Sequence, residues 1–150
     1  NILFEVKDVA QAGLAAHSKK NVSFIFQSYN LIDYMTPQEN VRLISKKQAL
    51  PFLERLGLTK EEIKRNVLKL SGGQQQRVAI ARALASEAPV ILADEPTGNL
   101  DEDTAGDITE ILKESAHQMK KCVVVVTHSN ELARQADVVF RLKKGELSME

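Results

Sequence analysis

Residues 90–96 decide the fold, and they read Val90-Ile91-Leu92-Ala93-Asp94-Glu95-Pro96. The first four residues form a short continuous apolar run, which is typical of a strand buried on both faces of a parallel sheet. Two carboxylates, Asp94 and Glu95, follow at the carboxyl end of this strand, where parallel sheets place their ligands. We expect them to point in different directions, one toward a metal ion and one toward a reacting water. An isolated Asp-Glu pair is more often a helix cap or a solvated charge, so its context decides.

The chain downstream alternates between helical and strand patterns. We expect a helix over 101–116, a second buried strand over 122–127, a short helix over 130–135 and a third strand over 138–142. Lys144-Gly145 then turns into a last extended piece. This order predicts an α/β fold with a parallel sheet. Cys122 opens the second strand, and we expect it to be a small buried hydrophobic residue.

The chain upstream is mostly helical. We expect a strand over 2–6, a short helix over 9–18 and a strand over 22–26, followed by helices over 38–44, 48–56 and 59–67. Thr59 with Glu62 three residues later is typical of a capping box. Ser71 caps a longer helix that runs to about residue 87. Residues 28–80 therefore form a helical lobe attached to the sheet.

Composition limits the class of protein. The 150 residues suffice for one domain, with 43% hydrophobic and 27% charged residues. Twenty basic residues balance twenty acidic ones, so the net charge gives no argument for a nucleic-acid partner. The longest apolar run, residues 122–126, is too short to span a bilayer. A single cysteine excludes an internal disulfide and fits a reducing compartment, so the composition indicates a soluble, cytoplasmic protein.

A glycine pair opens the long helix, in the string Leu70-Ser71-Gly72-Gly73-Gln74-Gln75-Gln76-Arg77. The first N–H groups of a helix are unsatisfied donors at the positive end of its dipole, and adjacent glycines let a ligand approach the backbone. The hydroxyl of Ser71 adds a further donor. Such a turn suits an oxyanion such as phosphate. A capped helix after a Gly-Gly turn is the alternative for these residues taken alone.

The full string matches the LSGGQ signature of ABC transporter ATPases, and four other elements match that family in order. Residues 90–96 resemble its Walker B motif, and residues 26–31, with Gln27, resemble its Q-loop. Asn99-Leu100-Asp101 resembles its D-loop, and His128 matches its switch histidine. The chain therefore resembles an ABC transporter ATP-binding subunit. This resemblance implies an α/β fold with a P-loop NTPase-type parallel sheet and an inserted helical subdomain.

The resemblance implies roles for these residues. Glu95 is the catalytic carboxylate, and His128 contacts the γ-phosphate. Asp94 holds Mg²⁺, and Gln27 reaches the metal and the attacking water. The signature residues Ser71, Gly72, Gly73 and Gln74 serve the ATP of the opposite subunit, and Asp101 crosses the dimer interface.

Three short strings narrow the resemblance to one branch: residues 97–101, 29–31 and 39–41 look most like the subunits of macrolide exporters, lipoprotein-release systems and bacitracin-type peptide exporters. In that branch the subunit binds ATP and Mg²⁺, pairs head to tail with a second ATPase subunit, and drives a transmembrane permease subunit. The resemblance thus implies a peripheral protein on the inner face of the cell membrane, powering export or extraction, with no nucleic-acid partner.

The phosphate-binding loop of such an ATPase should read G-x-x-x-x-G-K-[ST]. None of the seven glycines begins that pattern. The chain starts at Asn1 within an expected strand, so we expect a fragment whose Walker A loop lies upstream, in preference to a degenerate subunit. Residues 1–27 would then be the core after that loop, 28–80 the helical subdomain with Q-loop and signature, and 81–150 the core with Walker B, D-loop and histidine.

Two other functions are open to such a chain. The first is a non-hydrolysing module that docks on a membrane subunit, which ATP binding by the isolated chain would discriminate. The second is an ATPase of DNA repair or translation. Repair ATPases of this kind insert long coiled coils between their halves, whereas 43 residues separate Gln27 from Leu70, and translation factors carry two ATPase units in one chain. Both of these ATPase readings are disfavoured, and the isolated chain 1–150 is expected to be inactive.

Overall fold

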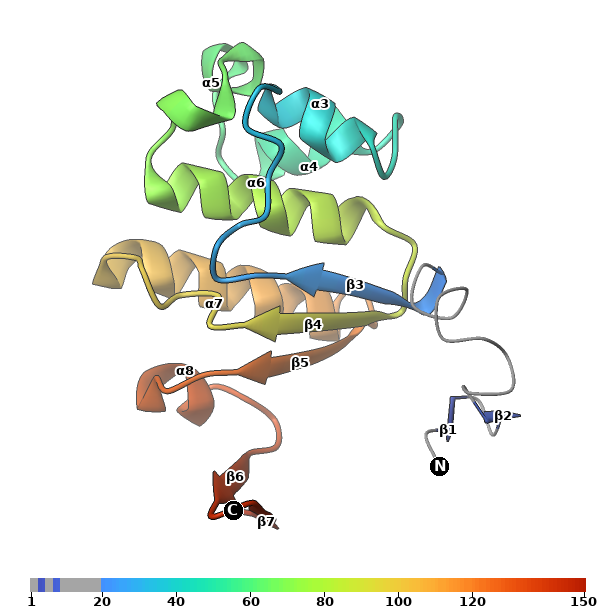
Figure 1. Ribbon diagram of the computed structural model, residues 1–150, viewed down its shortest axis with the longest axis vertical. Coiled ribbons are helices and arrows are strands. Elements are labelled where there is room, and N and C mark those ends of the chain that lie inside the picture. Colours follow the sequence, from blue (N-terminus) through green and yellow to red (C-terminus); the bar gives the residue numbers. More distant parts are fainter. Residues whose placement is uncertain (1–2, 5–6, 9–19) are drawn as a thin grey trace.

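The computed structural model describes residues 3–4, 7–8 and 20–150 (Figure 1). The strands are β1 (Leu3–Phe4), β2 (Lys7–Asp8), β3 (Val22–Ile25), β4 (Val90–Asp94), β5 (Cys122–Val126), β6 (Phe140–Lys143) and β7 (Glu146–Met149). The helices are α3 (Pro37–Arg42), α4 (Ala49–Arg55), α5 (Lys60–Lys64), the 3-10 turn η1 (Val67–Lys69), α6 (Gly72–Ala85), α7 (Glu102–His117) and α8 (Asn130–Arg134). The chain is thus α/β, as the sequence predicts.

A parallel sheet of three strands, in the order β3-β4-β5, positions the rest of the molecule. Val22 pairs with Val90, and Val90 pairs with Cys122, so the three strands start level. They also end on the same edge, where β3 leads into Gln27, β4 into Glu95 and β5 into Thr127 (Figure 1). Predicted site residues that are far apart in the sequence therefore lie at the same edge of the sheet.

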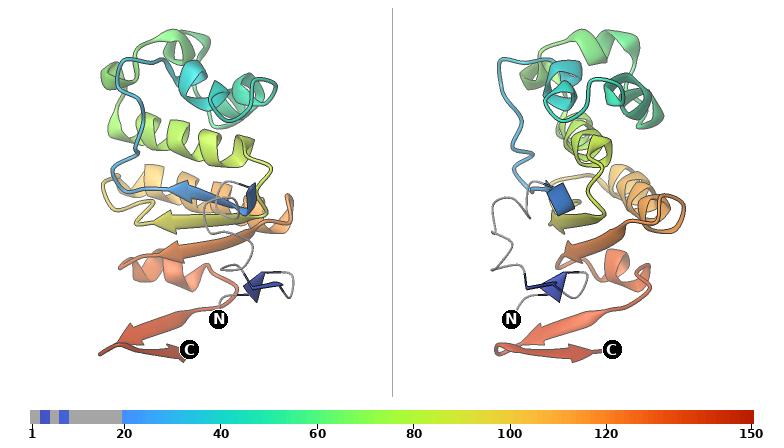
Figure 2. Two further views of the ribbon diagram at one scale, coloured as in Figure 1. Left: turned by 45° about the vertical axis from the view of Figure 1, so that its right-hand side comes forward. Right: turned by 90° about the vertical axis from the view of Figure 1, so that its right-hand side faces the viewer.

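Helices α6 and α7 cover one face of this sheet (Figure 2). Alternate strand residues on that face, Ser23 and Ile25 in β3 and Ile91 and Ala93 in β4, are buried. Ile25, Ile91 and Ala93 join a single apolar cluster that runs through α6 into the small helices α3, α4 and α5. The helix α6 is therefore a shared element, packed on the sheet on one side and on the helical lobe on the other.

The opposite face of the sheet is exposed in the part of the chain that the structure describes. Phe24 and Phe26 stack there with ring centroids 5.6 Å apart, and Val126 on β5 keeps 62% of its surface exposed. The prediction that Cys122 and its strand are buried is therefore wrong, because Cys122 is exposed. An apolar run in a sequence shows that a strand is hydrophobic but not that another element covers it. Among the described residues, no element packs on the side of β5 that carries Cys122, Val124 and Val126.

The small helices follow their local signals. Thr36 and Thr59 cap α3 and α5 with the capping boxes that such residues favour, and the one at Thr59 with Glu62 confirms the prediction. Gly57 ends α4 in the left-handed region, with φ of 79°. The predicted helices at 38–44, 48–56 and 101–116 are confirmed to within a few residues.

The C-terminal residues differ from the prediction of a third parallel strand. β6 pairs with β7 as an antiparallel hairpin and, among the described strands, with no other. The turn at Lys144-Gly145 is confirmed, with both residues at positive φ. The predicted helix over 9–18 lies outside the described residues, as does most of the predicted strand over 2–6, of which residues 3–4 form β1. No helix of the described residues is long and apolar enough to cross a membrane.

Candidate functional site at the carboxyl edge of the sheet

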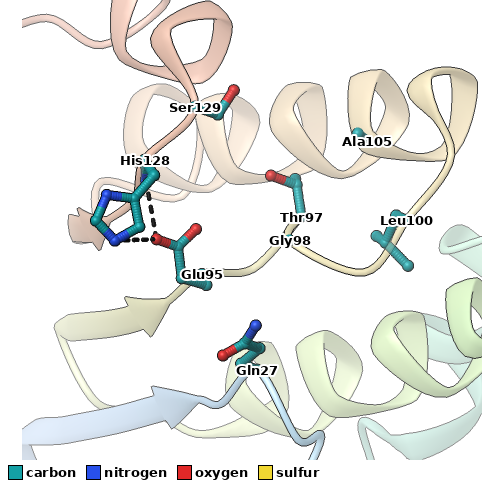
Figure 3. Close-up of a pocket in the computed structure, with 8 residues that line it drawn as sticks. All are labelled: Gln27, Glu95, Thr97, Gly98, Leu100, Ala105, His128 and Ser129. Carbon is teal, nitrogen blue, oxygen red and sulfur yellow. Dashed lines mark hydrogen bonds and ion pairs between the residues drawn. The ribbon is translucent and has the colours of Figure 1, made fainter.

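A pocket of about 560 Å³ opens at the edge where β3, β4 and β5 end. Its lining consists of Gln27, Glu95, Thr97, Gly98, Leu100, Ala105, His128 and Ser129 (Figure 3). Gln27, Glu95 and His128 were all predicted as site residues from sequence, and they follow three different strands. The fold therefore brings together three residues that lie up to a hundred positions apart.

Glu95 adopts an uncommon backbone conformation that directs its side chain. Its φ of 44° lies in the left-handed region, which costs a non-glycine residue about 1–3 kcal/mol. Two backbone hydrogen bonds hold it there: its N–H donates to the carbonyl of Val126 at 2.9 Å, and its carbonyl accepts from Gly98 at 3.1 Å. The strained turn therefore aims Glu95 into the pocket, whereas Asp94, still in strand conformation, does not line it.

The Glu95 carboxylate is fixed by two donors from the end of β5. The backbone N–H of His128 donates to Oε1 at 2.9 Å, and the hydroxyl of Thr127 donates to Oε2 at 3.2 Å. The same hydroxyl accepts from the backbone N–H of Ser129 at 3.0 Å, which sets its orientation. The carboxylate is 17% exposed, so it is held rigidly yet stays accessible to a molecule in the pocket.

The imidazole of His128 lies beside this carboxylate without bonding to it. Its Nε2 is 3.6 Å from Oε1 of Glu95, which is too long for a hydrogen bond, and the ring is fully exposed. An ion pair would form here only if the histidine were protonated. The backbone of His128 thus positions Glu95, while the ring remains available to a bound molecule.

Gln27 faces Glu95 from the end of β3 (Figure 3). Gly98 lies close to both, because a Cβ added there would come within 3.4 Å of Nε2 of Gln27 and 3.4 Å of Cβ of Glu95. A larger residue at 98 would therefore press on both side chains. The glycine keeps this part of the pocket open.

Asp94 and Gln27 offer the oxygen donors that suit Mg²⁺. The described residues hold no group of three or more His, Cys, Asp or Glu side chains that could form a metal cage. In nucleotide sites Mg²⁺ is held by one or two carboxylates with phosphate oxygens and waters, so such a cage is not needed. The exposed carboxylate of Asp94 at the end of β4, with the amide oxygen of Gln27, therefore fits this ion.

The signature turn lies apart from this pocket, at the start of α6. Ser71 caps the helix: its hydroxyl accepts from the N–H of Gln74 at 3.2 Å, and its own N–H donates to Oε1 of Gln74 at 2.9 Å. The amide of Gln74 also donates to Glu62 of α5. None of the four predicted signature residues lines the pocket.

Both signature glycines lie close to side chains of the same chain. A Cβ added to Gly72 would lie 3.0 Å from the hydroxyl of Tyr29, and one added to Gly73 would lie 2.8 Å from Cγ2 of Thr104. The sequence suggested that these glycines admit a ligand. The structure adds that they also admit the side chains of Tyr29 and Thr104.

Asp101 is the N-cap of α7 and does not line the pocket. It accepts from the N–H of Thr104 at 3.0 Å and from the Thr104 hydroxyl at 2.8 Å. The backbone bond, followed by the hydroxyl bond, lowers the pKa of the Asp101 carboxyl. Asp101 thereby holds the threonine that contacts Gly73.

Two residues of this region were missed from sequence. Thr127 anchors Glu95, and its only sequence signal is its place before His128 at a strand end. Gln76 is buried on the apolar face of α6, where its Nε2 donates to the carbonyl of Pro96 at 2.8 Å. A glutamine at a buried helical position is itself a signal, since buried polar groups need partners.

Comparison with known proteins identifies the family of this chain. Residues 1–98 match the sequence profile of the family described as ABC transporter. An uncharacterized ABC transporter ATP-binding protein of Bacillus subtilis, YclH, is 42% identical over 159 residues, which cover 99% of this chain and 70% of that protein. The macrolide export ATP-binding/permease protein MacB of Brucella melitensis is 41% identical over 144 residues, which cover 89% of this chain but only 22% of that protein.

Solved structures give the same answer. The dimeric post-hydrolysis structure of the ATP-binding cassette MJ0796 with ADP and Pi superposes with a TM-score of 0.82 at 39% identity. The match covers 96% of this chain and 67% of that one. The chain therefore belongs to the ABC transporter family, as an ATP-binding domain of its transport ATPases.

Proposed function

We propose that this chain supplies the hydrolytic residues of an ATPase that powers a membrane transporter, with Glu95 as the catalytic carboxylate. One observation supports this role: both oxygens of the Glu95 carboxylate accept hydrogen bonds. The backbone N–H of His128 donates one at 2.9 Å, and the hydroxyl of Thr127 donates the other at 3.2 Å. A carboxylate fixed in this way can orient or deprotonate a water in line with the γ-phosphate of ATP. No rearrangement of Glu95 is then needed at the moment of reaction.

His128 and Gln27 flank the position of the reacting water in this proposal. The exposed ring of His128 would contact the γ-phosphate and stabilise the charge on the transferred phosphoryl group. Gln27, across the pocket, would orient the attacking water. Its place opposite Glu95 in Figure 3 supports this role.

Asp94 and Gln27 would hold Mg²⁺ beside the pocket. Bound there, Mg²⁺ neutralises charge on the phosphate oxygens of ATP. Asp94 fits the ion because it is an exposed carboxylate at the same strand end as Glu95 and does not line the pocket. Of the two adjacent carboxylates, Asp94 would thus bind the metal ion and Glu95 would orient the water.

The signature turn would act on the ATP of a second ATPase subunit. Ser71, Gly72, Gly73 and Gln74 lie outside the Glu95 pocket, so they cannot serve a phosphate bound there from the same chain without a rearrangement. The relative MJ0796 is described as dimeric. A head-to-tail pair would bring the turn of one subunit to the pocket of the other, with Asp101 at the interface.

The membrane partner would be a transmembrane permease that binds the helical lobe. MacB is described as an ATP-binding and permease protein, which places the two functions together in that relative. We propose that residues 28–80 form the docking subdomain, and that 1–27 and 81–150 belong to the catalytic core. The subunit would then work at the cytoplasmic face of the membrane, in export or extraction of a substrate.

Replacing Glu95 by Gln in the full-length subunit tests the proposal. The amide keeps the shape but cannot take a proton, so hydrolysis should fall by at least about 10²-fold while ATP binding stays largely intact. The ATP-bound dimer should accumulate, which size-exclusion chromatography detects. Glu110→Gln, at an exposed glutamate of α7, is the matched control and should hydrolyse ATP normally. Turnover near wild type in Glu95→Gln would refute the assignment.

A further inference from the structure

The loop after β3 holds two consecutive residues in a conformation that side chains disfavour. Tyr29 has φ of 61° and Asn30 has φ of 50°, both in the left-handed region. The turn just before them is closed by the N–H of Tyr29, which donates to the carbonyl of Phe26 at 3.0 Å. Gln27 lies within that turn. Residues in such conformations persist only where their surroundings hold them.

Arg82 of α6 stabilises this loop conformation through hydrogen bonds. Its Nη1 donates to the carbonyl of Asn30 at 2.6 Å and its Nη2 donates to the carbonyl of Tyr29 at 3.1 Å. A guanidinium is a planar fork of donors, so it can grip two neighbouring carbonyls at once. The two carbonyls that it grips belong to the two left-handed residues.

Among the described residues, the hydrogen bonds of Arg82 all go to these two loop carbonyls. None of the ion pairs among residues 20–150 includes it, and burial lowers the pKa of its guanidinium. A half-buried charge is costly unless hydrogen bonds compensate. Hydrogen bonds to the two loop carbonyls offset the cost of burying this charge, so burial of the guanidinium depends on the loop.

Tyr29 makes a second contact with the same helix. Its hydroxyl lies so close to Gly72 that a Cβ there would be 3.0 Å away. Gly72 begins α6, and Arg82 lies ten residues further along, about 15 Å at the rise of an α-helix. The loop that carries Gln27 is therefore attached at both ends of the helix that carries the signature turn.

We propose that Arg82 is a positioning residue that locks the Gln27 loop onto α6, so that Gln27 and the signature turn move as one body. This inference rests on the proposed function, in which Gln27 orients the attacking water. Arg82 does not line the pocket that contains Glu95 and Gln27. It acts by holding the loop in the conformation that places Gln27 opposite Glu95.

Steady-state ATPase kinetics of the full-length subunit test this role in a double-mutant cycle. Arg82→Met keeps the apolar stem but removes both donors, and it should lower kcat by about tenfold, as a misplaced catalytic group does. KM for ATP should stay within about twofold, because the nucleotide contacts are elsewhere. Arg82→Lys keeps the charge but reaches only one carbonyl, so its kcat should be intermediate.

The cycle with Gln27→Ala separates positioning from general destabilisation. In that background Arg82→Met should change kcat by less than about twofold, because the side chain that it positions is already gone. The same tenfold loss in both backgrounds would overturn the proposal. Arg141→Met, at an exposed arginine of β6, is the matched control and should keep normal turnover.

Hydrogen exchange supplies a readout that is independent of turnover. The amides of residues 28–31 should exchange faster in Arg82→Met and Arg82→Lys, while those of α7 stay unchanged. Unchanged exchange in residues 28–31 would also overturn the proposal, and Arg82→Lys carries the test if Arg82→Met does not fold. Glu95→Gln reports separately on the proposed function: if it loses hydrolysis and Arg82→Met does not, only the role of Arg82 fails.

Discussion

The pocket at the strand ends and the signature turn differ in what their polar groups already bind. In the pocket, Glu95 is bonded to the end of β5 yet faces open space, with His128 and Gln27 beside it. In the turn, Ser71 and Gln74 are bonded to each other. The pocket is thus a cavity formed by one chain, whereas the turn is a surface that needs something brought to it.

This difference indicates how the work is divided. The geometry of Glu95 is set by neighbours within the chain, so the fold itself positions the carboxylate that we propose as catalytic. The signature turn instead offers the first N–H groups of α6, at the positive end of a helix of 14 residues. A turn of this kind contributes only when a second molecule presents an anion to it.

A protein consisting of residues 1–150 alone contains both regions, and it should still neither bind nor hydrolyse ATP. Neither region has the G-x-x-x-x-G-K-[ST] loop that cradles phosphates. Affinity for Mg-ATP should be no better than about millimolar, equivalent to roughly 4 kcal/mol. Calorimetric titration measures this directly.

The same protein should also self-associate. Among the described strands β5 pairs only with β4, and an unpaired edge recruits other chains. The exposed Phe24, Phe26 and Val126 add an apolar face. Light scattering should therefore report oligomers, and a monodisperse monomer that binds ATP at micromolar concentration would contradict both expectations.

Gly73→Asp in the full-length subunit should abolish hydrolysis and leave ATP binding by the single subunit intact. A carboxylate would stand where the γ-phosphate of the partner approaches, and like charges repel. If this variant fails to bind ATP at all, the turn does not act across the dimer.

Gly73→Ala separates charge from crowding in that experiment. Its Cβ would lie 2.8 Å from Cγ2 of Thr104, so overpacking should destabilise the fold by about 1–3 kcal/mol. Gly106→Ala is the control, since an added Cβ there meets nothing within 4 Å and should be neutral or stabilising by up to ~1 kcal/mol. Loss of hydrolysis in Gly73→Asp beyond that in Gly73→Ala measures the charge.

The smallest expected effect is on the stability of the fold at acid pH. The pKa of Asp101 is lowered in the folded state, chiefly by the backbone N–H of Thr104, so its stabilisation is present above the unfolded value of about 3.9 and is lost as pH falls below it. Asp101→Asn keeps a capping oxygen that does not titrate. Urea unfolding between pH 3 and 5 should therefore show a shallower acid loss in Asp101→Asn, and identical slopes would contradict the role of this cap.

Local signals in the sequence were enough for most of the fold. Thr59 and Ser71 identified helix starts because a cap involves residues only three positions apart. The meeting of Gln27, Glu95 and His128 followed from family motifs on predicted strand ends, whereas the strand order β3-β4-β5 came only from the structure. The burial of the strand at Cys122 was wrong because burial depends on what covers a strand, which an apolar run does not encode.

The finer parts of the site depend on contacts between distant segments. The left-handed φ of Glu95 has no marker, since glycine or asparagine usually signals that region. The bond from Thr127 to Glu95 joins residues 32 positions apart, and that from Arg82 to Tyr29 joins residues 53 apart. No periodicity or spacing rule reaches across such distances, so these partners emerge only from the folded chain.

The exposed thiol of Cys122 has a practical consequence for watching this molecule at work. It is the only cysteine in these 150 residues, and it starts β5 at the edge of the sheet opposite the pocket. Cys122 and Thr127 are five positions apart along the chain, about 16 Å at the usual rise of a strand. A maleimide fluorophore attached there would sit outside the reacting centre and still be near enough to report, by energy transfer, on a labelled nucleotide arriving at the strand ends.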